Sequence, residues 1–267
     1  MTFEGGAGCT GCGACVKDCG MGVLEMFEGR PRVREGKDAA CMGCQHCVAV
    51  CPQGAVALDG VGADACVPLV EMPIPPPNEV ANLLMSRRSV RQFVAADIPR
   101  DEIAWLLEAL KYVPPGCNIR HLVFRVVDGA AKMAALRERM MNLLFERIDA
   151  LPENLRAIVC AWKKDPKLDV FFRGAPHLLL VYGDPKAVTP QVDCSAACAY
   201  FDLLAQSAGV GTTWFGFLTH IVAAVPEVAD LFGMPRGAPF HAMLFGEPAV
   251  DYARCVNRSA GARVEWA

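Results

Sequence analysis

The sequence predicts an α+β protein built in two parts, and three observations support this prediction. Two short cysteine-rich runs lie within the first 51 residues of the 267-residue chain. Residues 67 to 77 then hold five prolines, a composition that favours a semi-rigid, extended spacer. Beyond them, helical and strand patterns alternate, as expected for helices packed around a central sheet. We therefore expect a small cysteine-rich domain (residues 1–66), a proline-rich linker (67–77) and a larger α+β domain (78–267).

The second cysteine run, CMGCQHCVAVCP at residues 41–52, has the spacing C-x2-C-x2-C-x3-C-P. Three thiolates with two residues between neighbours can curl around three irons of one cubane, whereas the fourth lies too far along the chain to close it. The run resembles that of bacterial two-cluster ferredoxins, in which the fourth cysteine binds the other cluster.

The first run, CTGCGACVKDC at residues 9–19, repeats this spacing and has Gly20 where the pattern expects proline. The two runs predict two 4Fe–4S clusters that exchange their fourth ligands. One cluster is expected on Cys9, Cys12, Cys15 and Cys51, and the other on Cys41, Cys44, Cys47 and Cys19. Zinc is the alternative, but its usual sites combine two short cysteine pairs across a longer loop, which fits these runs poorly.

Composition limits the other possibilities. The formal net charge of −3 gives no sign of nucleic-acid binding. The N-terminus has neither a basic nor an apolar signal region, so 14 cysteines indicate metal binding in a reducing cytoplasm and not disulfides. The six cysteines outside the runs lack ligand spacing, and we expect most to be small buried residues: Cys66, Cys117, Cys160, Cys194, Cys198 and Cys255.

The run from residue 203 to 226 is long enough to span a bilayer and contains no charged residue other than a possible His220. Its polar residues and glycines, and the lack of a basic flank, argue against a membrane span. A buried helix that passes through a glycine turn into a core strand is the better interpretation.

Elements of the larger domain follow from periodicity and from capping residues. The predicted helices cover residues 79–87 with Asn78 as N-cap, a segment opening at 97–99, residues 131–163 with a break at Pro152, and residues 193–208. The predicted strands cover residues 121–128, 177–183, 212–217 and 239–246. The tail from Glu247 shows no periodicity.

The segment SRRSVRQF, residues 86–93, places three arginines and two serines at the end of a helix. A solvated basic helix end is the ordinary explanation. A phosphate site is the alternative, because arginine forks match phosphate geometry.

The larger domain resembles the nitroreductase family over residues 79–267. The segment from Arg87 to Phe93 is similar to that family's FMN-binding opening. Further similarities follow in the family's order: Pro114-Pro115-Gly116-Cys117-Asn118 (a loop over the flavin ring), Gly209 to Gly216, Gly246-Glu247-Pro248, and Arg254 with Arg258. The whole chain thus resembles a ferredoxin–nitroreductase fusion.

This resemblance implies one FMN per subunit, bound at a homodimer interface. Arg87, Ser89, Arg91 and Arg258 would hold the phosphate end and Asn118 the flavin ring. The backbone of Gly216 and Phe217 would lie near flavin N5, and Arg88 and Pro115 complete the expected contact set. Three departures accompany it: Pro115 replaces a serine, Arg120-His121 replaces Gln-Pro, and Glu247 replaces a tyrosine. A structural role is the better interpretation of His121.

The predicted function is that of an oxidoreductase without a catalytic side chain. Electrons pass from the clusters to FMN and on to a nitroaromatic, quinone or flavin, with ferredoxin or NAD(P)H as the donor. The chain lacks a G-x-G-x-x-G motif that opens a helix after a strand, which argues mildly against a dedicated dinucleotide domain. A non-enzymatic electron carrier between partner proteins is the competing hypothesis. A regulatory sensor is a third, but no output domain is evident.

Overall fold

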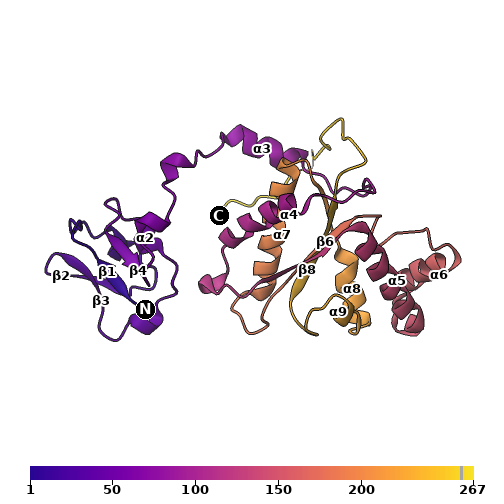
Figure 1. Cartoon of the computed structure of the whole chain (residues 1–267), viewed down its shortest axis with the longest axis horizontal. Helices are drawn as coiled ribbons and strands as arrows, with labels where there is room; N and C mark the ends of the chain where they lie inside the picture. Colours follow the sequence, from indigo (N-terminus) through magenta and orange to yellow (C-terminus); the bar gives the residue numbers. More distant parts are fainter. Residues whose placement is uncertain (259–260) are drawn as a thin grey trace. The chain divides into compact units, whose positions relative to one another are not determined.

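The computed structural model describes residues 1–258 and 261–267. The chain divides into two compact units (Figure 1). The first comprises residues 1–75 together with 117–119, and the second comprises residues 76–116 and 120–267.

The first unit is built from short elements. Strand β1 (Phe3–Gly5) pairs antiparallel with β4 (Val56–Leu58), and β2 (Leu24–Phe27) pairs antiparallel with β3 (Arg30–Val33). Two one-turn helices, α1 (Ala14–Lys17) and α2 (His46–Ala49), lie between strands, and 3-10 turns cover Asp38–Ala40 and Ala63–Ala65. The small core consists of Cys15, Leu24, Val48, Val56 and Leu58.

The internal duplication is visible in the backbone. Helix α1 follows Gly13, whose φ is 73°, and α2 follows Gln45, whose φ is 60°. Both residues lie between the second and third cysteines of their run. The same left-handed turn therefore starts the helix in each repeat, once on the residue best suited to it and once on a glutamine.

The proline-rich segment is not extended throughout, which corrects the prediction. Residues Leu69–Glu71 form a 3-10 turn, and helix α3 (Pro77–Ser86) begins at Pro77, ahead of the predicted cap Asn78. Proline suits the first helical position because it has no N–H group to leave unsatisfied and its φ is already helical.

The second unit contains a four-stranded antiparallel sheet in the order β5-β6-β8-β7. The strands are β5 (Val123–Asp128), β6 (His177–Tyr182), β8 (Phe240–Gly246) and β7 (Gly211–Trp214). The central pair places Leu178 opposite Leu244 and Leu179 opposite Met243. All four side chains are buried, because helices cover both faces of the sheet (Figure 1).

Alternate residues of β6 and β8 enter two separate cores. Leu178, Leu180 and Leu244 pack with α5 (Ala130–Glu146), α6 (Glu153–Lys164), α8 (Gly216–Ala224) and α9 (Val228–Leu231). Leu179 and Met243 pack on the opposite face with α4 (Arg100–Glu108) and α7 (Pro190–Ser207). A 3-10 turn, Ala109–Tyr112, extends α4, and another covers Ile148–Ala150 between α5 and α6. The predicted α+β class is confirmed.

The predicted strand over residues 212–217 is too long. Strand β7 ends at Trp214, and α8 begins at Gly216. The turn is fixed at Phe215, whose N–H donates to the carbonyl of Ala242 while its own carbonyl accepts from the N–H of Leu218. The uncharged run of residues 203–226 therefore holds the end of α7, a turn at Gly209, β7 and α8. Among the described residues, no helix combines the length and the apolar character needed to cross a membrane.

The expectation that most of the other six cysteines are buried is wrong, because only two of them are. Cys194 and Cys198 are buried on α7, where burial raises the pKa of each thiol to about 12. Cys66, Cys117 and Cys255 are exposed, and Cys160 is half-buried.

Candidate functional site

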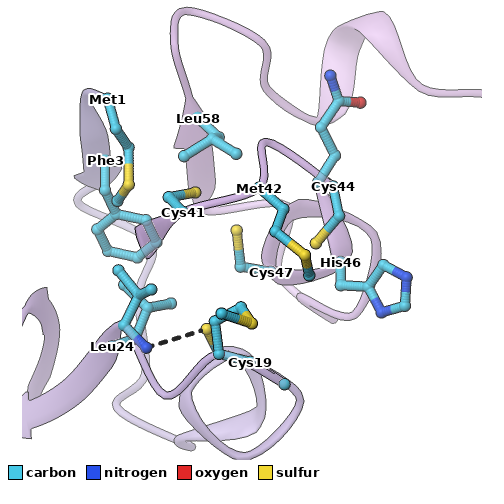
Figure 2. Close-up of a pocket in the computed structure, with 14 residues that line it drawn as sticks. Met1, Phe3, Cys19, Leu24, Cys41, Met42, Cys44, His46, Cys47 and Leu58 are labelled. Carbon is cyan, nitrogen blue, oxygen red and sulfur yellow. Dashed lines mark hydrogen bonds between the residues drawn. The ribbon is translucent and has the colours of Figure 1, made fainter. Parts of the chain in front are cut away.

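The cysteines of the first unit surround two cavities. The first, shown in Figure 2, is lined by Cys41, Cys44 and Cys47 of the second run and by Cys19 of the first run. Apolar side chains complete its wall, including Phe3, Leu24 and Leu58. This is the ligand set expected from the sequence for one of the clusters.

The second cavity is lined by Cys9, Cys12 and Cys15 of the first run and by Cys51 of the second run. The fold therefore brings together two sets of four thiols, each made of three cysteines from one repeat and the last cysteine of the other. Within residues 1–258 and 261–267, no three His, Cys, Asp or Glu side chains converge closely enough to hold a single metal ion.

Backbone N–H groups point at the cysteine that crosses between repeats. The N–H of Val23 donates to Cys19 Sγ at 3.3 Å, and the N–H of Ala55 donates to Cys51 Sγ at 3.3 Å. Both donors lie four residues after their cysteine, so the two repeats place them identically. The N–H of Gly43 donates in the same way to Cys41 Sγ at 3.4 Å. Such donors stabilise charged sulfur ligands and tune a bound cluster.

Burial disfavours free thiolates in these cavities. Burial, with a smaller contribution from the neighbouring Cys44, raises the pKa of Cys47 to about 11. Burial also raises the pKa of Cys15, although backbone hydrogen bonds oppose it. A bound iron–sulfur cluster would supply the positive iron that deprotonates these groups. The composition, grouping and hydrogen bonding of the thiols fit this cofactor.

In the second unit, the fold joins three segments that are far apart in sequence. The N–H of Val90 donates to the carbonyl of Thr212 at 2.8 Å. The N–H of Val94 donates to the carbonyl of Glu247 at 2.9 Å, and the N–H of Ala249 donates back to Gln92. The basic segment after α3 is thereby fastened to β7 on one side and to the segment after β8 on the other.

Gly211 permits one of these contacts. A Cβ at this position would lie 2.9 Å from Val90 Cγ2 and 3.0 Å from Val90 Cβ. These distances are too short for real side chains, so a glycine is required where the basic segment crosses β7.

Arg87 forms an ion pair with a buried carboxylate, that of Asp202. Its Nη1 atom lies 3.3 Å from Asp202 Oδ2, and the Asp202 side chain is only 7% exposed. The hydroxyl of Thr212 donates to the other carboxylate oxygen of Asp202. Asp202 is absent from the residues predicted from the sequence, because α7 also contains Asp193 and only the tertiary contact shows that Asp202 pairs with Arg87.

Three arginines line one cavity of about 630 Å³, which we call the arginine cavity. Its walls are formed by Leu84, Met85, Arg87, Arg88, Cys255, Val256, Asn257 and Arg258. The predicted residues Arg87, Arg88 and Arg258 thus meet, although they come from opposite ends of the domain. Ser89 is not among the lining residues, and its carbonyl accepts a hydrogen bond from the hydroxyl of Tyr252 at 3.3 Å.

Arg91 lies along a different cavity of about 360 Å³, which we call the aromatic cavity. Its walls are formed by Arg91, Phe171, Arg173, Thr213, Trp214, Phe215, Gly216, Phe217, His220 and Leu244. The predicted residues Gly216 and Phe217 are therefore grouped with Arg91 and not with Arg87. A Cβ at Gly216 would have no heavy atom within 4 Å. Open space thus lies where the family resemblance expects the flavin ring.

Pro115 and Asn118 line neither of these two cavities. Asn118 ends a 3-10 turn, Gly116–Asn118, in which Cys117 and Asn118 have positive φ values of 51° and 56°. Both residues belong to a strained loop, which is common at functional sites.

His121 has a structural role in a buried network around Asp193. The N–H of Asp184 donates to His121 Nδ1 at 3.1 Å, so the ring proton is on Nε2, which donates to Asp193 Oδ2 at 2.8 Å. Asp193 also accepts from the Thr189 hydroxyl and from the N–H of Gly116. Although burial raises the pKa of Asp193, these hydrogen bonds outweigh it and hold the pKa below the usual value.

Comparison with known proteins identifies the families to which the two parts of the chain are similar. A model of the nitroreductase family matches residues 84–247, and a model of the 4Fe-4S dicluster domain matches residues 8–56. The chain belongs to the nitroreductase family. Its family domain is preceded by a 4Fe–4S ferredoxin-type domain, as the sequence predicted.

The family relatives include flavin-bound structures. A nitroreductase with bound FMN from Bacteroides fragilis is 26% identical, with a TM-score of 0.58 over 70% of this chain and 100% of its own. An iodotyrosine deiodinase from Thermotoga neapolitana is 25% identical over 135 residues, 49% of this chain and 70% of that protein. A structure of iodotyrosine deiodinase bound to FMN and 3-iodo-L-tyrosine shares the fold at 18% identity, with a TM-score of 0.51. The predicted class of FMN-dependent oxidoreductase is confirmed at the level of the family.

Proposed function

We propose that this nitroreductase-family member is a ferredoxin-type fusion enzyme that passes electrons from two 4Fe–4S clusters to FMN and on to a small acceptor. The observation that carries the proposal is that the candidate cluster ligands gather in one unit and the candidate FMN contacts in the other. Two thiol tetrads surround two cavities in the first unit. In the second unit, three arginines line one cavity, and open space beside Gly216 lies in another.

The proposed cluster ligands are the two tetrads. Cys9, Cys12, Cys15 and Cys51 would hold one cluster, and Cys41, Cys44, Cys47 and Cys19 the other. The matching backbone donors to Cys19 and Cys51 support equal roles for the two crossing cysteines.

The proposed FMN contacts keep the predicted set and divide it by cavity. Arg87, Arg88 and Arg258 would hold the phosphate in the arginine cavity, with Ser89 beside them. Arg91, Gly216 and Phe217 would face the flavin ring, and Pro115 and Asn118 would contribute from their loop. The three arginines support this division, because guanidinium groups are the side chains best suited to phosphate.

Bound flavin supplies the link between single-electron input and two-electron output. The chain would hold the ring in place and leave its reactive edge open, and no side chain is assigned a catalytic role. A nitro group reduced to nitroso takes up two electrons and two protons and releases water. Quinones and free flavins are acceptors of the same two-electron class.

The proposed assembly is a homodimer that receives electrons from a ferredoxin-type protein or from NAD(P)H. The alternative is an electron carrier that serves partner proteins. The aromatic cavity favours the enzyme, because a flavin ring bound beside Gly216 in an open cavity would stay accessible to a small acceptor.

Anaerobic purification followed by cofactor analysis and steady-state assays would test the proposal. We expect about eight irons and one FMN per chain, and donor-dependent reduction of nitrobenzene or a quinone. Zinc in place of iron would contradict the cluster assignment. A holoprotein inactive toward every two-electron acceptor would contradict the proposed enzyme activity and favour the electron carrier.

A further inference from the structure

The aromatic cavity contains positive charge beyond the proposed FMN contacts. Arg91 belongs to the predicted flavin set, but Arg173 also lines the cavity and adds a second guanidinium group. None of its ten lining residues is an aspartate or a glutamate. The cavity therefore combines cationic groups with aromatic walls.

Arg173 is held in an unfavourable backbone conformation. Its φ is 57°, in the left-handed region that residues other than glycine and asparagine rarely adopt. The next residue, Gly174, is also left-handed, with a φ of 69°. An arginine in a conformation suited to glycine is a backbone outlier, and such outliers cluster at functional sites.

Asp169 holds this turn in place. Its Oδ1 atom accepts from the N–H of Phe172 at 2.9 Å, and its Oδ2 atom accepts from the N–H of Gly174 at 2.9 Å. Arg137 Nη1 lies 2.9 Å from the same Oδ2 atom, and the Asp169 side chain is only 11% exposed. The backbone on both sides of Arg173 is thus fixed by one carboxylate that is itself paired with Arg137.

Aromatic side chains complete the cavity around these charges. Phe171 and Phe217 meet edge to face, with ring centroids 5.3 Å apart, and Trp214 lies in the same wall. Flat aromatic ligands pack well against such walls, and a guanidinium group pairs with a carboxylate.

We propose that Arg173 determines acceptor specificity by binding the anionic group of an aromatic acceptor, of the aromatic carboxylate class. The proposal rests on the proposed function, because it places the acceptor in the cavity where Arg91, Gly216 and Phe217 are proposed to face the flavin ring. It adds a binding group for the acceptor that the FMN contacts do not include.

The test compares two acceptors that differ in one charge, 4-nitrobenzoate and nitrobenzene, on the holoenzyme. Arg173→Gln should raise KM for 4-nitrobenzoate about ten- to a hundredfold, the usual loss for a charge-assisted contact. KM for nitrobenzene should stay within about twofold. Arg236→Gln is the matched control, since Arg236 is an exposed arginine paired with Asp230 and does not line this cavity.

A second variant separates binding from folding. Arg173→Gly removes the side chain at a position where glycine is the favoured residue, so its thermal midpoint should equal or exceed that of the parent. It should lose the preference for 4-nitrobenzoate as fully as Arg173→Gln does. Equal losses on both acceptors in either variant would overturn the proposal.

Calorimetric titration with benzoate, which cannot be reduced, provides a readout that does not depend on turnover. Both Arg173 variants should bind benzoate about ten- to a hundredfold more weakly than the parent. If the protein reduces neither nitro compound but benzoate still requires Arg173, the proposed reaction fails while the anion site stands. Unchanged benzoate affinity in both variants would refute the anion site.

Discussion

At the scale of single residues, the charge of Arg87 is shared between an internal partner and the proposed phosphate. Asp202 lies 3.3 Å from Arg87, is nearly buried, and is also bonded by Thr212. Removal of Arg87 should therefore have two consequences, a loss of ligand affinity and an uncompensated buried carboxylate.

Arg87→Ala should weaken FMN binding about ten- to a hundredfold and lower the free energy of unfolding by about 1 to 3 kcal/mol. Adding Asp202→Asn should recover most of the stability, because the amide oxygen can still accept from Thr212. It should leave FMN binding weak. Flavin titration of the apoprotein and chemical denaturation measure the two effects. FMN affinity restored by Asp202→Asn would place the phosphate elsewhere.

Gly216 offers a test of the ring site that does not disturb the protein's own packing. A Cβ there meets no heavy atom within 4 Å, and the residue begins α8. Gly216→Ala should leave the thermal midpoint of the apoprotein unchanged or slightly raised. A methyl group that crowds the flavin should weaken FMN binding by about 1 to 3 kcal/mol. Gly62→Ala, where a Cβ meets only Ala57 at 3.7 Å, is the control. Equal FMN affinities in both variants would show that the ring does not approach Gly216.

His177 predicts a pH dependence of stability. It is fully buried at the start of β6, and burial lowers its pKa below 6.5, with only partial opposition from Asp128 and Asp97. The N–H of Ile98 donates to His177 Nε2 at 2.8 Å, so the proton of the neutral ring is on Nδ1, which lies 3.3 Å from Asp128 Oδ1. An imidazolium has no lone pair left to accept from Ile98.

Because the folded pKa is depressed, the unfolded chain binds more protons below pH 6.5. The stability contributed by neutral His177 is complete above that pH and falls as the pH drops toward the folded pKa. The loss cannot exceed about 1.4 kcal/mol per pH unit for one proton. His177→Gln should flatten the decline between about pH 7 and about pH 5 in denaturation curves. Parallel curves for the parent and the variant would contradict this assignment.

The limits of sequence reasoning are clear at this scale. Arg87 and Arg258 could be paired in advance because a family motif orders them along the chain, and the structure places both on one cavity. The sequence could not predict the contacts of Asp202 and Asp193, because they depend on the tertiary fold. It could not predict the left-handed backbone of Arg173 either. Periodicity and spacing carry no information about either.

At the scale of elements, strands β6 and β8 were predictable because both are continuous apolar runs bounded by turn residues. The boundary between β7 and α8 was not. Thr212 to Phe217 has strand-like composition, and the N–H of Phe215 still bonds to the carbonyl of Ala242 in β8. The carbonyl of Phe215 instead accepts from the N–H of Leu218, and this bond begins α8. The composition of the segment does not indicate where that change occurs.

The two repeats of the first unit lead to a prediction about crossed ligands. Cys19→Ala removes one member of the tetrad in Figure 2 and leaves Cys9, Cys12, Cys15 and Cys51 complete. Cys51→Ala does the reverse. Each variant should keep about half of the iron, and low-temperature EPR should show loss of a different cluster in each.

The control for this pair is Cys66→Ala, because Cys66 is exposed and lines neither cavity. It should retain the full iron content. If Cys19→Ala and Cys51→Ala removed the same cluster, the crossed assignment would be wrong.

At the scale of the whole molecule, the chain joins two chemistries that the sequence separates at its proline-rich segment. The cysteine spacing alone was enough to predict the ferredoxin-type part, because ligand geometry dictates sequence spacing. The flavin part needed several weak motifs together, since each segment contributes only a few contacts. The direction of electron flow follows from neither motif nor fold.

Rapid mixing of the oxidised holoprotein with a reduced ferredoxin-type donor tests that direction most directly. Freeze-quenched samples would report cluster reduction by EPR, and flavin absorbance would report the second unit. We expect the clusters to be reduced first and the flavin to follow. In the Cys19→Ala or Cys51→Ala variant the flavin phase should be slower, while dithionite should still reduce the flavin. Flavin reduction that precedes the clusters, or that keeps its rate in both variants, would contradict entry through the clusters.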